Sequence, residues 1–341
     1  MKQKNTKNQQ SLSRFFAVIA ALFALLVLLF FASLGAGYTD LSISQIFAVL
    51  LGKGTREQNL ILFQFRLIRI VLAIMVGAGL AVSGTVFQTI SKNALASPDL
   101  LGVNAGAGIA VLCATVMESE DRALGILALP FAALFGALLT ALLIYGLSNR
   151  KGAPLSPLRL VLVGVSVTSG IHALDMILTV RLSPEHYNTV NTWLIGSVYG
   201  NRWAHVLVLL PWLLIIPFFI YQAGKLNLLH LSDGVAVGLG SELARNRLIA
   251  LLLATALAAA CVAVGGTIGF VGLVCPHLAK SLVGPNHARS IPASALTGAV
   301  LLLASDLVAR TIVAPREMLL GIVVSLIGAP YFLYILMTSK K

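Results

Sequence analysis

Long apolar stretches separated by short polar segments recur along the whole chain. With Gly, Pro and charged residues read as boundaries, the pattern predicts about ten membrane-crossing helices, each near the roughly 20 residues that span a bilayer. The sequence therefore predicts an all-α integral membrane protein, with a single transmembrane domain over residues 15–341 after a basic tail over residues 1–14. The predicted helices cover residues 15–37, 64–88, 99–117, 124–147, 159–180, 204–222, 247–265, 268–283, 293–311 and 318–337.

Composition supports this class. The chain has 341 residues, of which 58% are hydrophobic and 11% charged, whereas a soluble domain is about 45–50% apolar and about 25% charged. The first apolar stretch lacks a small-residue cleavage site and is too long for the core of a signal peptide, so we expect it to remain uncleaved. Cys113, Cys261 and Cys275 are far apart in apolar sequence, which predicts core residues without disulfides.

The distribution of basic residues sets the topology. Basic residues precede the first helix and two lysines end the chain, and positive loops tend to stay in the cytoplasm. Ten crossings place both ends inside, whereas nine would place the C-terminus outside. The count depends on the eighth helix, which is short and contains Pro276. We therefore predict ten helices with both termini cytoplasmic.

Nine of the 24 basic residues fall on the outer side in this topology, and this number weakens the positive-inside asymmetry. Some of them have acidic neighbours in the sequence. Arg66 and Arg69 have none within several positions, so local pairing does not explain them. The outer set comprises Lys53, Arg56, Arg66, Arg69, Arg122, Arg181, Arg202, Arg310 and Arg316.

Catalytic and nucleotide-binding patterns are absent from the sequence. It contains no phosphate-binding loop, no H-E-x-x-H and no nucleophile elbow, and its six histidines show no metal-ligand spacing. We therefore expect a protein that is not an enzyme, with no catalytic residue, no metal and no cofactor of its own. The net charge of +12 is explained by loops near anionic headgroups, so no nucleic acid is expected.

Two carboxylates fall within predicted helices, and an acid inside a membrane is by default a candidate functional group. Asp306 has Arg310 four positions later, which favours an ion pair on one helix face. Asp175 lies about a turn and a half before Arg181, near the outer end, and either faces a wet cavity or relays protons. A proton relay at Asp175 is the basis of an alternative function, an autonomous proton-coupled secondary transporter.

The inner segment 223–247 predicts one short amphipathic helix. Ser232 or Asp233 is a suitable N-cap, and Gly238 and Gly240 end the helix. Its apolar face fits either the membrane interface or the groove of a cytoplasmic partner, and the pattern alone does not decide between them. The apolar face consists of Leu228, Leu229, Leu231, Val235 and Leu239.

Several ordered motifs run from about Arg66 to the end of the chain. With these motifs in this order, the chain resembles the FecCD-type permease subunits of type II ABC importers, which carry iron–siderophores, haem and cobalamin. The motifs are RLIR followed by VGAGLAVSG; QTISKNALASPDLLGVNAGA; LNLLHLSDGVAVGLG; GTIGFVGLVCPHLAK with HARSIPASALTGA; and ASDLVAR leading to EMLLGIVVSLIGAPYF.

The resemblance implies the type II importer permease fold in a bacterial cytoplasmic membrane. It implies an identical or homologous second permease subunit, two ATPase subunits that bind ATP and Mg, and an extracytoplasmic substrate-binding protein. An iron–siderophore is the expected cargo, with haem and cobalamin as alternatives.

The resemblance also assigns roles to residues. Arg66, Arg69 and Arg310 occupy the positions that dock the binding protein. Segment 223–247 becomes a coupling loop whose helix enters the ATPase groove, and Asn93, Leu95 and Ser156 fall at the cytoplasmic gate. The coupling positions are Leu231, Ser232, Asp233, Gly234, Val235, Gly238, Leu239 and Gly240.

The chain departs from the family pattern at four positions. Ala94, Ile68 and Leu319 stand where the family usually has proline, and Cys275 stands where it usually has valine. These departures concern local backbone rigidity, particularly beside the gate, because proline restricts the backbone and the other residues do not.

Overall fold

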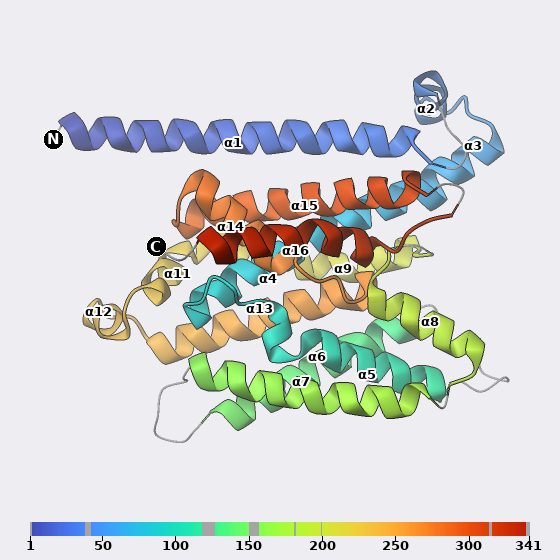
Figure 1. Cartoon of the computed structure of the whole chain (residues 1–341). Coiled ribbons are helices and arrows are strands. Elements are labelled where there is room, and N and C mark those ends of the chain that lie inside the picture. Colours follow the sequence, from blue (N-terminus) through green and yellow to red (C-terminus); the bar gives the residue numbers. More distant parts are fainter. Residues whose placement is uncertain are drawn as a thin grey trace.

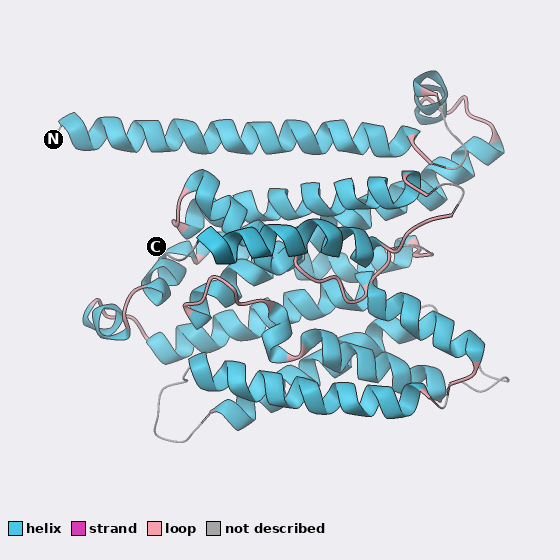
Figure 2. Cartoon of the chain, viewed as in Figure 1, coloured by secondary structure: helices cyan, strands magenta, loops and turns pink. Residues whose placement is uncertain are grey.

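The computed structural model describes residues 2–37, 42–117, 127–149, 157–180, 182–198, 200–313 and 316–338. Every regular element that these residues form is helical (Figure 2), as predicted. In chain order, the elements are α1 (Lys2–Gly35), α2 (Ile43–Leu50), α3 (Arg56–Leu60), a π-helical segment (Ile61–Arg66), α4 (Leu67–Ser91), a 3-10 turn (Pro98–Leu101), α5 (Val103–Val116), α6 (Ala128–Ser148), α7 (Pro157–Thr179), α8 (Pro184–Ile195), α9 (Trp203–Leu213), α10 (Ile215–Tyr221), α11 (Ala223–His230), α12 (Asp233–Gly238), α13 (Leu243–Gly265), α14 (Val271–Val283), α15 (His287–Thr311) and α16 (Leu320–Thr338).

Helix α4 is the centre of the larger group of helices. Most of its residues are buried, and it packs against α13, α14 and α15. Glycines bring these backbones together, because a Cβ on Gly77 would overlap the Gly298 carbonyl and one on Gly84 would overlap the Gly272 carbonyl. Such close approach is how helices in lipid gain packing energy without a hydrophobic driving force.

Helices α5, α6 and α7 form a second group. Gly106 of α5 and Gly136 of α6 lie in backbone contact, so the two helices pack tightly. Helix α13 contacts both α4 and α6 and thereby joins the two groups. Helix α7 lies at the edge of the second group, and little of its membrane-length window is buried in the single chain.

Helix α1 runs along the outside of the bundle beside α15 (Figure 1). Phe15, Val18 and Ile19 pack against α14 and α15 near one end. The N-terminal end of α1 and the C-terminal end of α16 lie at the same end of the bundle as α12 (Figure 1). An even number of crossings requires this arrangement, as the ten-helix topology predicted.

Eight helices in the described part of the chain are long and apolar enough to cross a membrane. Two shorter apolar helices, α5 and α14, match the predicted third and eighth crossings. Prediction made α5 too long because Gly102 adopts a left-handed conformation (φ 62°), which separates the 3-10 turn from the helix. The eighth helix is present as α14, and it accommodates Pro276 within its length.

Other boundaries differ from prediction. The predicted crossing over 204–222 is divided into α9 and α10, just after Pro211. Helix α1 begins well before its predicted start. Cys261 and Cys275 are buried as expected, but the core prediction is wrong for Cys113, which is exposed in the single chain.

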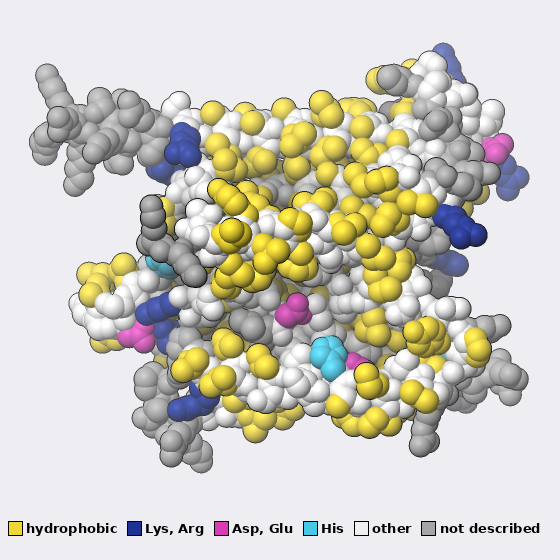
Figure 3. Space-filling view, in the orientation of Figure 1, with side chains coloured by type: hydrophobic (Ala, Val, Ile, Leu, Met, Phe, Trp, Pro, Cys, Tyr) yellow, Lys and Arg dark blue, Asp and Glu magenta, His cyan; other side chains and the backbone are white. Residues whose placement is uncertain are grey.

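The surface matches the topology. A broad hydrophobic belt covers the face shown in Figure 3, and Lys and Arg side chains gather toward the two ends of the helices. The two ends therefore carry the candidate docking and coupling residues, and one polar interruption lies within the belt.

Candidate functional site

The three predicted docking arginines lie together at the end of the bundle opposite α12. Arg66 ends the π-helical segment, Arg69 lies in the first turn of α4, and Arg310 lies in the last turn of α15. Their residues are only 5–7% exposed. Arginine side chains this deeply buried require partners within the protein.

Arg69 finds its partners far away in the sequence. Its Nε atom forms an ion pair with Asp306, and its Nη1 atom lies 2.6 Å from Oε2 of Glu317. The predicted pair between Asp306 and Arg310 is confirmed, with Nε and Oδ2 separated by 3.1 Å. Asp306 thus sits between two guanidinium groups and is fully buried.

Arg66 and Arg310 hold the C-terminal end of α1. Arg66 donates hydrogen bonds to the carbonyls of Leu34 and of Gly35, the latter at 2.8 Å. Arg310 donates to the Ser33 hydroxyl and to the Ala36 carbonyl. The last carbonyls of a helix lack intrahelical donors and carry negative partial charge, so these arginines satisfy them and fix α1 to α4 and α15.

A cavity of about 750 Å³ opens beside these arginines. Its walls carry Arg66, Arg69, Arg202 and Arg310 with Glu317. Four guanidinium groups face one wall carboxylate, so the cavity favours anionic groups. Arg202 is the exposed member of the four, whereas the three predicted residues are largely engaged within the chain.

Sequence reasoning grouped Arg66, Arg69 and Arg310 correctly in space but left the first two without partners. The contacts that were missed are those of Arg69 with Glu317 and with Asp306. Both lie more than 230 residues from Arg69, and spacing along one chain cannot show such a contact. The docking role of the three arginines stays a prediction.

At the opposite end of the bundle, most of the surface of α12 is exposed. Val235, Val237 and Leu239 are more than half exposed, whereas Ala236 is fully buried. Part of the predicted apolar face is wrong, because Leu229 belongs to a separate helix, α11, and is buried against the bundle. Val237 belongs to the exposed face and was not predicted.

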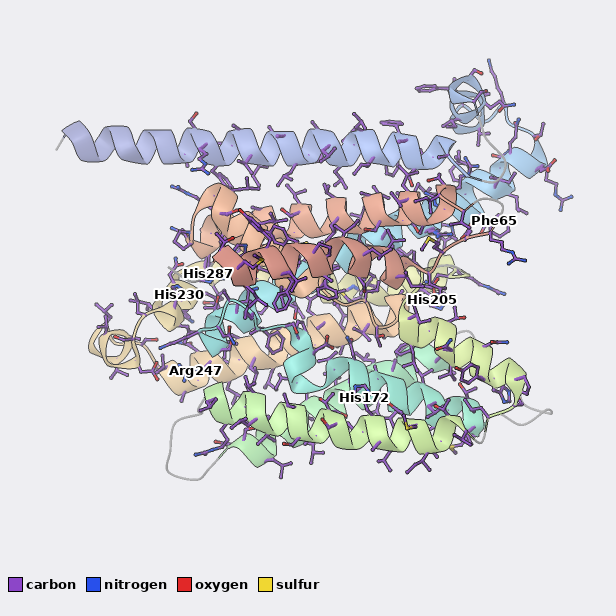
Figure 4. The ribbon with its side chains drawn as sticks, in the orientation of Figure 1. Phe65, His172, His205, His230, Arg247 and His287 are labelled. Atoms are coloured by element: carbon purple, nitrogen blue, oxygen red, sulfur yellow. The ribbon has the colours of Figure 1, made fainter. Side chains whose placement is uncertain are left out.

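The first residue of α12 is fixed by two cations from other segments. The Lys92 Nζ atom lies 2.6 Å from Oδ1 of Asp233, and the Arg247 Nη2 atom lies 3.2 Å from the same oxygen. The hydrogen bond from Lys92 is the principal cause that lowers the Asp233 pKa. Arg247 is buried near the start of α13, at the α12 end of the bundle (Figure 4). Neither Lys92 nor Arg247 was predicted from the sequence to contact Asp233.

Lys92 also begins the predicted gate segment. It ends α4 in a left-handed conformation (φ 51°). The next residue, Asn93, accepts a hydrogen bond from the Leu95 backbone N–H at 2.9 Å and so forms a local turn. This turn needs no proline, so Ala94 is accommodated. Ser156 lies outside the described residues, and the gate role of Asn93, Leu95 and Ser156 stays a prediction.

Asp175 lies on α7 beside His172, with Oδ2 of Asp175 at 3.5 Å from Nδ1 of His172. Arg181, the cation near it in sequence, lies outside the described residues. Among the described residues, no group of His, Cys, Asp and Glu side chains has a metal-binding arrangement.

Comparisons with known proteins agree with this architecture. Residues 25–338 match the FecCD transport family. An iron(3+)-hydroxamate import permease of Bacillus subtilis is 42% identical over 95% of this chain and 97% of its own length. An Fe(3+)-citrate import permease of the same organism is 39% identical over 98% of both chains. A hemin transport permease of Yersinia pestis is 37% identical over 95% of this chain and 96% of its own length.

A solved structure supports the fold independently. A chain of a metal-chelate type ABC transporter in an inward-facing conformation superposes with a TM-score of 0.83. The match covers 94% of this chain and 99% of that chain, at 32% sequence identity.

Proposed function

The chain belongs to the FecCD transport family, and we propose that it is the membrane-spanning permease of an ATP-driven importer of ferric chelates. The observation that carries this proposal is the match in fold, over 94% of the chain, to a metal-chelate type ABC transporter. The relatives named for hydroxamate, citrate and hemin import support an iron chelate as cargo. An iron–siderophore fits this range best, and haem or cobalamin is the alternative.

A permease of this kind works with other subunits. A second permease chain, identical or homologous, completes the pathway, and two ATPase subunits bind ATP and Mg in the cytoplasm. The absence of a phosphate-binding loop from this sequence is consistent with that division of roles. The assembly operates in a bacterial cytoplasmic membrane, with a binding protein delivering the chelate from outside.

The cytoplasmic end provides the coupling. The exposed apolar side chains of α12 enter a groove of the ATPase. The Asp233 carboxylate contacts Lys92, so movement of α12 is transmitted to the segment that begins at Asn93. ATP-driven movement of the ATPase subunits thereby changes the opening of the pathway.

The outer end provides the docking surface. The arginine-lined cavity accepts carboxylates of the binding protein, and Arg202 is the exposed cation available for first contact. Because Arg66 and Arg310 also hold the end of α1, a docked protein would act on α1, α4 and α15 together. Exposed ion pairs contribute only about 0–1 kcal/mol each, so charge at this surface mainly sets orientation and association rate.

Reconstitution tests the proposal. The complete assembly in vesicles, with ATP inside and the loaded binding protein outside, should accumulate iron-55 as a chelate. Omission of ATP, or an ATPase subunit that cannot hydrolyse it, should abolish accumulation. Iron uptake that persists without ATP would contradict an ATP-driven importer.

A proton-coupled secondary transporter is the second candidate, because Asp175 and His172 form a titratable pair on a membrane helix. This chain alone, in vesicles with an imposed pH gradient, distinguishes the two. Substrate accumulation under those conditions would favour the second candidate, whereas the ABC permease requires its partners and ATP.

A further inference from the structure

The hydrophobic belt is interrupted between α16 and α7. Figure 3 shows acidic side chains and a histidine there, with hydrophobic side chains above and below them. His172 lies on the middle part of α7 (Figure 4), and its side chain is 64% exposed. Asp99, in the 3-10 turn that packs against α7, is also exposed. These groups lie away from the two charged ends of the bundle.

The groups form one connected cluster with unused hydrogen-bonding capacity. His172 and Asp175 form a pair at 3.5 Å, and Asp99 accepts a hydrogen bond from the Asn104 side chain and interacts electrostatically with His172. The Oδ1 atom of Asp175 is buried and has no hydrogen-bond partner among the described residues. A carboxylate oxygen of this kind requires water or a ligand.

This face cannot be an ordinary lipid-facing surface. A charged side chain at the centre of a bilayer costs at least about 2.5–3.5 kcal/mol, and here two carboxylates both interact with His172. The adjoining surface of α7 is also small and polar, with Ser166, Ser169 and Gly170 exposed. Both features are typical of a water-filled route.

We propose that Asp99, His172 and Asp175 form a negatively charged site on the wall of the transport pathway, which passes cationic and neutral ferric chelates in preference to polyanionic ones. The site rests on the proposed permease function and specifies the charge class of its cargo. Two carboxylates outweigh one histidine, and a second copy of the chain would double the field. Rings of acidic side chains select cations in channels by the same electrostatic principle.

Transport by the complete assembly measures this selectivity. The probes are a cationic ferric trihydroxamate, a neutral one and anionic ferric citrate, each labelled with iron-55. The readout is the ratio of cationic to anionic uptake in each variant divided by that ratio in the wild type, which cancels the preference of the binding protein. We expect Asp175→Asn to lower this ratio about threefold to tenfold, and Asp99→Asn to lower it further in combination.

Glu57→Gln is the matched control, because this carboxylate is exposed on α3, at a distance from α7 (Figure 1). It should leave the ratio unchanged. A ratio that is equally unchanged in Asp175→Asn, with total uptake intact, would overturn the inference while leaving the permease function standing. If the wild-type assembly takes up none of the three chelates, the proposed function itself is overturned, and the inference with it.

A chemical readout does not depend on transport. Ser169→Cys, in a chain whose exposed Cys113 is replaced by Ser, places a thiol one turn from His172. It should react with water-soluble methanethiosulfonate reagents, and the cationic reagent should be favoured over the anionic one several times more than with a free thiol. Asp175→Asn should remove most of that preference. An unreactive thiol, or a preference unaffected by Asp175→Asn, would contradict a charged aqueous site.

Discussion

The Lys92 ammonium lies 2.6 Å from the Asp233 carboxylate, so the residue that caps the C-terminal end of α4 contacts the first residue of α12. The two residues are 141 positions apart in the sequence. One belongs to the segment that leads to the proposed gate and the other to the helix proposed to contact the ATPase. Because the two side chains are in direct contact, single substitutions of either residue can test whether this contact couples α12 to the gate segment.

Asp233→Asn and Lys92→Gln should each reduce coupling more than stability. Both side chains are partly exposed, so loss of their contact should change the free energy of unfolding by no more than about 1 kcal/mol. The amount of chelate imported per ATP hydrolysed should fall severalfold in either variant. Parallel measurement of uptake and phosphate release in vesicles checks this ratio.

The double variant with the two charges exchanged, Lys92→Asp with Asp233→Lys, is the informative companion. It retains attraction between the segments but places the new ammonium group of α12 beside the Arg247 guanidinium, so it should restore coupling only in part. Uptake per ATP that stays at the wild-type value in both single variants would show that this contact does not transmit the movement of α12.

The contact should also govern the titration of Asp233. Its pKa is lowered, first by the hydrogen bond from Lys92 and further by the charge of Arg247. A lowered pKa means that the stabilisation is fully present above the unfolded value of about 3.9 and is lost as the pH falls through the folded value. The ion pair between Lys92 and Asp233 should therefore persist between about pH 5 and pH 8, and coupling should not weaken through its loss in this range. Lys92→Gln should raise the Asp233 pKa, which carboxyl carbon-13 NMR of labelled protein would measure.

Arg69→Gln should destabilise the fold strongly. It removes one of the two guanidinium groups that flank the fully buried Asp306, and it also takes a partner from Glu317. Breaking a buried ion pair from one side typically costs about 3–5 kcal/mol. Thermal unfolding in detergent should show a clear loss, and Asp306→Asn in the same chain should recover part of it.

Arg316→Gln is the control, because Arg316 is exposed at the same end of the molecule. It should change the free energy of unfolding by no more than about 0.5 kcal/mol. If Arg69→Gln is as stable as this control, Arg69 does not stabilise the fold, and docking is the only role left for it.

This structural role changes how docking should be tested. Charge reversal of Arg66 or Arg69 would disturb folding and docking together. Arg202→Glu alters an exposed cation of the same cavity instead. It should slow association with the binding protein, with a smaller effect at high salt, because screened charges steer less. Binding rates measured at two ionic strengths test this directly, and rates equal to wild type at both would exclude a contribution from Arg202.

Sequence patterns predicted the parts of the fold that depend on local composition. Apolar runs gave the helices, and the charge distribution gave the even number of crossings. The i, i+4 spacing gave the pair between Asp306 and Arg310, which the structure confirms. Irregular backbone was predicted less well, because the left-handed turn at Gly102 and the division of 204–222 near Pro211 fall within apolar stretches that a hydropathy pattern treats as continuous.

The candidate sites were likewise predicted only in part. Motif order grouped the outer arginines and identified α12, but the partners that hold them come from distant segments. Arg69 pairs with Glu317 across 248 positions, and Asp233 pairs with Lys92 across 141. No periodicity within one segment encodes such contacts. His172, three positions before Asp175, was within reach of sequence reasoning, since that spacing places both on one helix face.

Replacement of Gly84 by Ala tests the packing that holds α4 against α14. A Cβ at this position would overlap the Gly272 carbonyl, and a backbone group cannot swing aside as a flexible side chain can. Overpacking of this kind costs about 1–3 kcal/mol, so the midpoint of thermal unfolding in detergent should fall. Gly146→Ala on α6 is the matched control, because open space surrounds that position and Ala favours helix. If the two variants unfold at the same temperature, α4 and α14 do not require backbone contact at Gly84.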